Sequence, residues 1–380
     1  MAAVQPPPSK RRRTHGEGGH SGAVIEGLPD HVAEICLSLV DRPSLIAAVC
    51  SRWRRLLYSP SFPAFLSMYV VFVDPDPGPG RVRVMSFDPV SSRWDTLPPP
   101  PPEAGSLIRR HQSFISLDFP IQSVSVAGKL VLLAGSTREL SPALSHPVVF
   151  DPVSSTWTPG PTMEYPRRWC AAGAHGDAVY VASGMGSQFS PDMARSAEKW
   201  AISGDAVRRH EWEKLKDLKD GRFSREAIDA VGWRGKLLMV NVRGDAVKEG
   251  AIYDVVKDTW QAMPADMLAG WKGPVAAMAP DETLYAVDET RGTVAKYDEE
   301  RREWGEVVAE EERLKGAYQI AAVAGKLCVV AGGGGGGRRI VVVDVAAAPA
   351  PAKVWSVECP EGLEPVAVHV LPRASRPEFR

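Results

Sequence analysis

The spacing of apolar residues changes once along the chain. Between Ile25 and Phe65, apolar side chains recur every three to four positions, which is the period of an amphipathic helix. From Met68 onward, short apolar runs alternate with clusters of Gly, Pro, Asp and Ser, which is the pattern of short strands joined by turns. The sequence therefore predicts a small helical segment followed by a much larger all-β region.

Two helices are predicted in the helical segment, separated by a turn at residues 41–44. Pro29 and Asp30 suit the start of the first helix. Its apolar stripe consists of Val32, Ile35, Cys36, Leu39 and Val40. The second helix carries its apolar side chains on one side, namely Leu45, Ile46, Val49, Trp53, Leu56 and Leu57. Two helices of this size do not form a stable domain alone, so they need a partner or the rest of the chain.

The β region contains an internal repeat. Residues 87–94, Phe-Asp-Pro-Val-Ser-Ser-Arg-Trp, return at 150–157 with a single change. An apolar strand end, an Asp-Pro pair with two serines, and a Trp that opens the next strand together predict a tight hairpin. Looser copies bring the number of expected hairpins to six. Their closing tryptophans are Trp94, Trp157, Trp212, Trp260, Trp304 and Trp355.

Each hairpin is expected to be half of a four-stranded unit. The tryptophans are spaced by about 52 residues on average, close to the period of roughly 50 of one class of propeller blade. Before each hairpin a first strand leads through a tight turn, such as the one at Gly128, into a second apolar strand. The first unit lacks a first strand, whereas the apolar stretch Val366–Leu371 is left over at the end. The last strand should therefore complete the first blade and close a six-bladed β-propeller.

Charge and composition exclude several function classes. Lys and Arg number 45 against 46 Asp and Glu, so no global field attracts nucleic acid or a membrane surface. The chain has neither an apolar run of about 18 residues nor a signal peptide, so we expect no membrane partner and an intracellular location, in the nucleus, the cytoplasm or both. Residues 1–22 and 373–380 should be disordered tails; the basic run Lys10–Arg13 is either a nuclear signal or a solvated end.

The sequence offers little for catalysis or metal binding. The five cysteines form no C-x-x-C pair and have no His at metal spacing, so they are expected to be small buried hydrophobes, and no cofactor or metal is expected. No set of Ser, His and Asp, or of Cys and His, can be assembled from spacing. The glycine run 332–337 leads into a strand rather than a helix, which argues against a phosphate-binding loop.

Two sets of motifs resemble a known family. Leu28-Pro29-Asp30, residues 49–56 (Val-Cys-Ser-Arg-Trp-Arg-Arg-Leu) and Ser59–Phe62 resemble the start and end of an F-box, spanning residues 23–66. Residues 166–173 and 176–184 resemble a kelch repeat, and the kelch-type propeller would span residues 67–372. The whole chain after the N-terminal tail is thus similar to plant F-box/kelch-repeat proteins. The fold expected is an N-terminal α-helical F-box followed by an all-β kelch-type propeller.

The resemblance implies a function without catalysis by this chain. It implies the substrate-recognition subunit of an SCF-type E3 ubiquitin ligase, in which the F-box binds a Skp-type adaptor, and through it cullin, while the propeller binds a target protein. Other subunits would transfer ubiquitin, so the chain would not be an enzyme. Apolar residues that would either contact the adaptor or hold the helices together are Leu28, Pro29, Ile35, Leu39, Val49 and Trp53.

A candidate target-binding surface comes from residues that precede or open the first strand of a blade. They are Arg167, Arg168, Trp169, Arg222, Arg225, Trp271 and Lys272. Gathered at one end of the propeller channel, they would suit recognition of an acidic ligand. Alternatively, the arginines are solvated and the tryptophans belong to the core. Two rival functions also stay open: a ligand-binding or catalytic propeller with a helical cap and no ligase role, and an interaction scaffold.

Overall fold

The computed structural model describes residues 23–40, 43–59, 62, 65–73, 82–102, 104, 121–137, 139–203, 211–224, 228–240, 248–279, 281–332, 337–346 and 352–374. It divides into two compact units, Met1–Pro63 and Ala64–Arg380. The N-terminal tail expected at residues 1–22 lies outside the described residues, and so do residues 375–380 of the expected C-terminal tail. Within the described ranges, no helix is both long and apolar enough to cross a membrane.

The first unit contains three helices rather than the predicted two. They are α1 (Asp30–Ser38), α2 (Pro43–Val49) and α3 (Ser51–Leu57). Cys50 is extended, with φ −158° and ψ 166°, and its thiol accepts a hydrogen bond from the backbone N–H of Trp53 at 3.4 Å. Because this residue caps α3, it breaks the long amphipathic run into two short helices.

The apolar stripe predicted for the first helix is not the face that α1 buries. Ala33 and Leu37 are the buried residues of this helix, whereas Ile35 and Leu39 are 59% and 77% exposed. Cys36 is exposed as well, so the expectation that every cysteine is buried also fails. Part of the apolar surface of α1 is therefore in contact with solvent.

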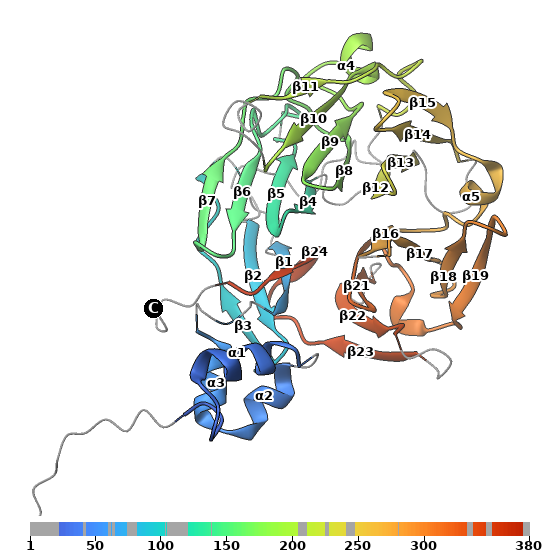
Figure 1. The fold of residues 1–380 in the computed structure, drawn as a ribbon. Coiled ribbons are helices and arrows are strands. Elements are labelled where there is room, and N and C mark those ends of the chain that lie inside the picture. Colours follow the sequence, from blue (N-terminus) through green and yellow to red (C-terminus); the bar gives the residue numbers. More distant parts are fainter. Residues whose placement is uncertain are drawn as a thin grey trace, which may run out of the picture. The chain divides into compact units, whose positions relative to one another are not determined.

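The second unit is a six-bladed β-propeller, as predicted, in which each blade is a four-stranded antiparallel sheet (Figure 1). Blade 1 contains β24 (Glu364–Pro372), β1 (Leu66–Val73), β2 (Val82–Asp88) and β3 (Arg93–Thr96). Blade 2 contains β4 (Gln122–Val126), β5 (Lys129–Ala134), β6 (Val148–Asp151) and β7 (Thr156–Pro159). Blade 3 contains β8 (Ala171–His175), β9 (Ala178–Ala182), β10 (Ala197–Ala201) and β11 (Glu213–Lys214). Blade 4 contains β12 (Asp229–Trp233), β13 (Lys236–Val240), β14 (Gly250–Asp254) and β15 (Thr259–Ala262). Blade 5 contains β16 (Val275–Met278), β17 (Thr283–Val287), β18 (Val294–Asp298) and β19 (Glu303–Val308). Blade 6 contains β20 (Gln319–Val323), β21 (Lys326–Ala331), β22 (Arg339–Asp344) and β23 (Lys353–Val357). Two short helices, α4 (Pro191–Arg195) and α5 (Ala265–Ala269), lie in connections.

The last strand closes the ring, as the leftover apolar stretch predicted. β24 pairs antiparallel with β1, from Leu66 opposite Pro372 to Val73 opposite Glu364. The closing contacts extend past the expected domain end at residue 372, because the backbone N–H of Arg373 donates to the carbonyl of Phe65 at 2.8 Å. Inner strands β4, β8, β12, β16, β20 and β24 follow one another around the channel.

The tight turns after the inner strands have the backbone geometry that their sequences predict. At the β4–β5 turn, Ala127 and Gly128 both have positive φ, 47° and 72°. A type I′ hairpin turn requires this geometry at both central residues, and Gly adopts it without a steric penalty. The second hairpin of blade 1 relies on a side chain instead: the Asp88 carboxylate accepts the N–H groups of Val90 and Ser91 at 2.8 and 3.3 Å.

The repeated tryptophans join neighbouring blades. In five of the six, the indole N–H donates to a backbone carbonyl in the connection that follows the preceding blade. The pairs are Trp94 with Glu358, Trp157 with Pro98, Trp212 with Pro161, Trp260 with Lys216 and Trp304 with Met267, at 2.6 to 3.0 Å. The sixth, Trp355, is 38% exposed. The repeat therefore encodes both the hairpin and a contact with the preceding blade.

Candidate functional site

The first unit carries an exposed apolar surface. It comprises five of the six predicted adaptor-binding residues. These are Leu28 (37% exposed), Pro29, Ile35 (59%), Leu39 (77%) and Val49 (59%). Several large apolar side chains exposed on one small helical unit are consistent with an interaction site.

The sixth predicted residue, Trp53, has a structural contact. Its indole N–H donates to the backbone carbonyl of Val24 at 2.7 Å. The backbone N–H of Val24 in turn donates to the Asp30 carboxylate at 2.8 Å. Arg54 donates twice to the carbonyl of Ala47, at 3.1 and 3.0 Å, which ties α3 to α2. Trp53 thus helps to hold the helical unit together, whereas the side chains of the other five predicted residues are exposed.

The predicted target-binding residue Arg167 lies inside the propeller. Its side chain is fully buried and forms an ion pair with Glu198 of β10. It also donates to the carbonyls of Ser183 and Tyr165, at 2.9 and 3.0 Å. Burial raises the pKa of Glu198, and the positive charge of Arg167 opposes that rise. With every described donor engaged inside the protein, this residue cannot form part of a recognition surface.

Three further predicted residues are also part of the core. Arg168 is buried, donates to the carbonyl of Gly186 at 3.1 Å and stacks over the ring of Trp169 at 3.7 Å. Trp169 is only 8% exposed. Trp271 has no exposed surface, and its indole N–H donates to the carboxylate of Asp229 at 2.9 Å. For the tryptophans, the alternative interpretation as core residues is the one that fits.

The remaining predicted residues do not form a basic cluster. Arg222 is about half exposed and pairs with Asp220 and Glu249, at 2.8 and 3.0 Å. It lines a groove of about 240 Å³ beside β15, away from the channel. The amine of Lys272 lies 3.9 Å from the Asp288 carboxylate. Arg225 lies outside the described residues.

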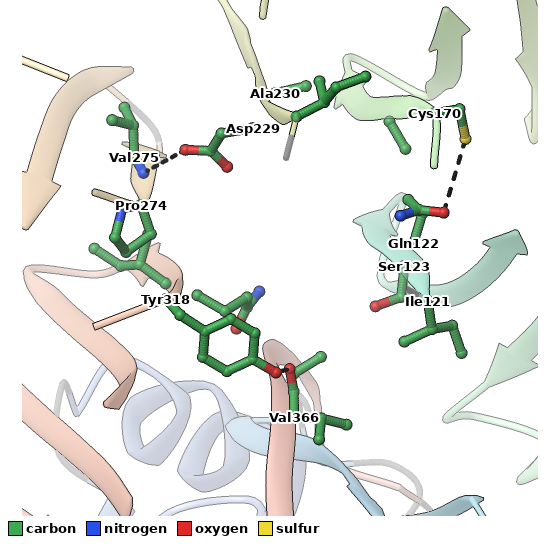
Figure 2. A pocket seen from close by; sticks show the side chains of 15 residues that line it. Ile121, Gln122, Ser123, Cys170, Asp229, Ala230, Pro274, Val275, Tyr318 and Val366 are labelled. Atoms are coloured by element: carbon green, nitrogen blue, oxygen red, sulfur yellow. Dashed lines mark hydrogen bonds between the residues drawn. The ribbon is translucent and has the colours of Figure 1, made fainter. Parts of the chain in front are cut away.

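A second candidate site is the mouth of the central channel, a cavity of about 140 Å³ shown in Figure 2. We define the channel mouth by the residues that line it. They are Ile121, Gln122, Ser123, Cys170, Ala172, Ile228, Asp229, Ala230, Pro274, Val275, Tyr318, Gln319, Ile320, Val366 and Ala367. Every blade contributes at or near the start of its inner strand. The mouth therefore lies at the end of the propeller opposite the tight turns.

Hydrogen bonds fix the polar groups of the channel mouth. Figure 2 shows the Asp229 carboxylate facing Val275, whose backbone N–H it accepts at 3.2 Å. The hydroxyl of Tyr318 donates to the carbonyl of Val366. The Gln319 side chain bonds twice to the backbone of Val368, accepting at 2.7 Å and donating at 3.1 Å. These bonds join blade 4 to blade 5 and blade 6 to blade 1 at the mouth.

A buried histidine lies in the seam between blades 1 and 2. His369 of β24 bonds through its two ring nitrogens to the hydroxyls of Ser123 and Ser125 of β4, each at 2.9 Å. Either neutral tautomer satisfies both contacts, because a hydroxyl can donate or accept. Burial lowers the pKa of His369 to about 4 from its ordinary 6.5. Folding therefore favours the neutral ring.

We predict an acid-sensitive stability from His369. Its contribution is complete above its unfolded pKa near 6.5 and declines as the pH falls toward about 4, since only the unfolded chain binds the proton there. Between about pH 7.5 and about pH 5, the free energy of unfolding should fall by about 2 kcal/mol because of this residue. Urea unfolding at both pH values measures the loss. In His369→Gln, whose amide can serve both serines, the pH-dependent loss should be smaller by that amount; an equal loss in both proteins would contradict the assignment.

These sites were also compared with the requirements for metal binding in the part of the chain that the structure describes. There, no group of three or more His, Cys, Asp or Glu side chains is placed to hold a metal ion. Burial raises the pKa of the Cys170 thiol at the channel mouth to about 12, which keeps it protonated and unreactive.

Sequence reasoning missed the polar residues of the channel mouth, although a signal for them exists. Gln122, Asp229 and Gln319 each stand at the first position of an inner strand, in alternate blades. The other positions of these strands are mostly apolar or small. A polar residue recurring at one position of a repeat marks a shared location, here the rim of the channel.

Comparisons with known proteins agree with this architecture. The chain is 62% identical over 388 aligned positions to the F-box/kelch-repeat protein SKIP25 of Arabidopsis thaliana, covering 99% of this chain and 96% of that protein. It is 24% identical to the Arabidopsis F-box protein AFR, covering 67% and 66% of the two chains, and 24% identical to the Arabidopsis F-box/kelch-repeat protein SKIP4, covering 71% of each. No family model matches the chain.

Proposed function

Because the chain belongs to the plant F-box/kelch-repeat family, we propose that it is the substrate-recognition subunit of an SCF-type ubiquitin ligase. In this proposal the helical unit binds a Skp-type adaptor, and through it a cullin, while the propeller holds a target protein for ubiquitination. The chain itself performs no chemical step. The basic run Lys10–Arg13 is consistent with a location in the nucleus, the cytoplasm or both.

The observation that carries the proposal is the exposed apolar surface of the helical unit. Ile35 of α1 and Leu39, which caps the C-terminus of α1, are more than half exposed, although Ile46 and Leu57 of the same unit are buried. A unit that can bury some apolar side chains but leaves others in water is suited to a partner that covers them. The F-box motifs lie in this unit, so a Skp-type adaptor is the partner proposed.

The topology of the propeller gives it two distinct ends. The chain enters the propeller at Leu66, opposite Pro372 at the C-terminal end of the inner strand β24, where the tight turns also lie. The channel mouth lies at the N-terminal ends of the inner strands. The first residue of β1 and the channel mouth thus belong to opposite ends of the propeller, and we propose the channel mouth as the end that receives the target.

Replacing Ile35 and Leu39 together by Ala is expected to weaken adaptor binding by roughly 30-fold or more, as for two residues near the centre of an interface. Alanine favours helix, so the substitutions should leave α1 folded. The measurement is co-purification and titration of the full chain with a Skp-type adaptor. Val153→Ala with Val256→Ala is the matched control, because these residues are 66% and 90% exposed in propeller turns.

The control variant should bind the adaptor as the parent does. A folded parent that fails to bind any Skp-type adaptor would contradict the proposed function. Undiminished binding by the Ile35→Ala, Leu39→Ala variant would show instead that the adaptor uses another surface.

A further inference from the structure

Five consecutive prolines, residues 98–102, lie in the connection between blades 1 and 2. The connections that follow blades 2 to 6 make the same kind of link, and their sequences contain no two adjacent prolines. Joining one blade to the next therefore does not require this proline run. The run is also not part of the exposed apolar surface of the helical unit or of the channel mouth.

The conformation of the proline run is fixed by its own sequence. The pyrrolidine ring holds φ at about −65°, and a following proline disfavours the helical region, so residues 98–101 are confined to polyproline II geometry. A polyproline II helix has about three residues per turn, so the rings of Pro99 and Pro102 lie along one edge. Both of these prolines are exposed, and so is Pro98. The run therefore presents two rings, three positions apart, to solvent.

Both ends of the proline run are anchored in the core that blades 1 and 2 share. Leu97, directly before the run, is 6% exposed, and Ala104, two residues after it, is fully buried; both belong to one hydrophobic cluster. The carbonyl of Pro98 accepts the indole N–H of Trp157 at 2.9 Å, and the carbonyl of Pro101 accepts the backbone N–H of Ala104 at 2.9 Å. Because the run is held in place before any partner arrives, binding would cost little conformational entropy.

The chemistry of the proline run specifies the kind of surface that fits it. Each proline has a backbone carbonyl but no N–H group, and its side chain is an apolar ring without charge. A complementary surface must therefore offer flat apolar faces to the rings and N–H or O–H donors to the carbonyls. Trp and Tyr combine an apolar ring with such a donor. Grooves lined by aromatic side chains bind polyproline II segments for this reason.

We propose that residues 98–102 are a docking site for a second protein that has a groove lined by Trp and Tyr, with the rings of Pro99 and Pro102 entering the groove. The inference goes beyond the ligase role, because it needs neither the adaptor nor a target at the channel mouth. It gives the propeller a further binding surface, in the connection between blades 1 and 2.

The probe is a panel of purified proline-recognition domains with aromatic-lined grooves, WW domains among them, titrated against the full chain. At least one domain is expected to bind, with an affinity that hardly changes with salt, because no charge pair is involved. Pro99→Ala together with Pro102→Ala should weaken this binding by about tenfold or more, as for the loss of two interface anchors. Pro89→Ala with Pro191→Ala is the matched control, because it replaces two exposed prolines outside the run and should bind as the parent does.

Thermal unfolding shows whether the Pro99→Ala, Pro102→Ala chain is intact. If it is not, a synthetic peptide of residues 95–104 tests the same contact: it should displace the parent chain from the domain, whereas the peptide with both substitutions should not. Failure of every domain to bind, equal binding by the two substituted chains, or binding that the peptide does not displace would overturn the inference. Adaptor co-purification is scored separately and should be the same for the parent and both variants.

Discussion

A chain that ends at Leu363 is expected to lose the cooperative folding of its propeller. Without β24, blade 1 keeps three strands, and β1 presents an unpaired edge from Leu66 to Val73. The deletion also removes the buried side chains of Val366, Val368 and Leu371. Their burial contributes about 5–9 kcal/mol, which approaches the roughly 5–15 kcal/mol by which whole domains are stable.

The loss should extend beyond blade 1, because β24 contacts blades 2 and 6 as well. Blade 6 would lose the bonds that Tyr318 and Gln319 make to the backbone of β24. Blade 2 would lose the bonds of Ser123 and Ser125 to His369 of β24. An open ring leaves sheet edges that pair with other molecules, so the truncated protein should also aggregate.

Thermal and urea unfolding followed by circular dichroism measure this prediction. The matched control ends at Ala374, which retains β24 and the Arg373 contact with Phe65, and should unfold as the full chain does. Adding a peptide of residues 361–374 to the truncated chain should restore a cooperative transition if closure is the cause. A truncated chain that unfolds cooperatively within a few degrees of the control would mean that the ring does not depend on β24.

The propeller could be predicted because its information is local and repeated. Each hairpin is specified by a few neighbouring residues, such as the Asp88 turn, and six copies reinforce the same interpretation. Closure followed from counting strands. The helix boundaries were harder to predict, because the break at Cys50 depends on the backbone angles of one residue. The buried face of α1 was also hard to predict, because apolar residues recur with the helical period on two of its faces.

The burial of residues such as Arg167 and Trp271 could not be predicted because their partners lie far away in the sequence. Arg167 precedes a strand, as a residue of a recognition loop would, but its partner Glu198 is 31 positions later on β10. Trp271 likewise bonds to Asp229, 42 positions earlier. Only the order of strands in the sheets brings these pairs together, and it decides which of these side chains are buried.

Replacing Arg167 alone by Met is expected to destabilise the propeller by about 3–5 kcal/mol, since it leaves the buried Glu198 carboxylate without its counterion. The carbonyls of Ser183 and Tyr165 would lose their donor as well. Glu198→Met should have a comparable effect, because the guanidinium would then be a buried charge without a carboxylate. Urea unfolding of both variants measures these losses.

The double variant separates the charge from the space it fills. With Arg167 and Glu198 both replaced by Met, no charge remains buried at this site, and stability should recover to within about 1–2 kcal/mol of the parent. Arg291→Met removes one half of an exposed pair with Glu310 and should cost less than about 1 kcal/mol. If the double variant is as unstable as the sum of the single ones, the two side chains act independently, and the ion pair is not what holds the start of blade 3.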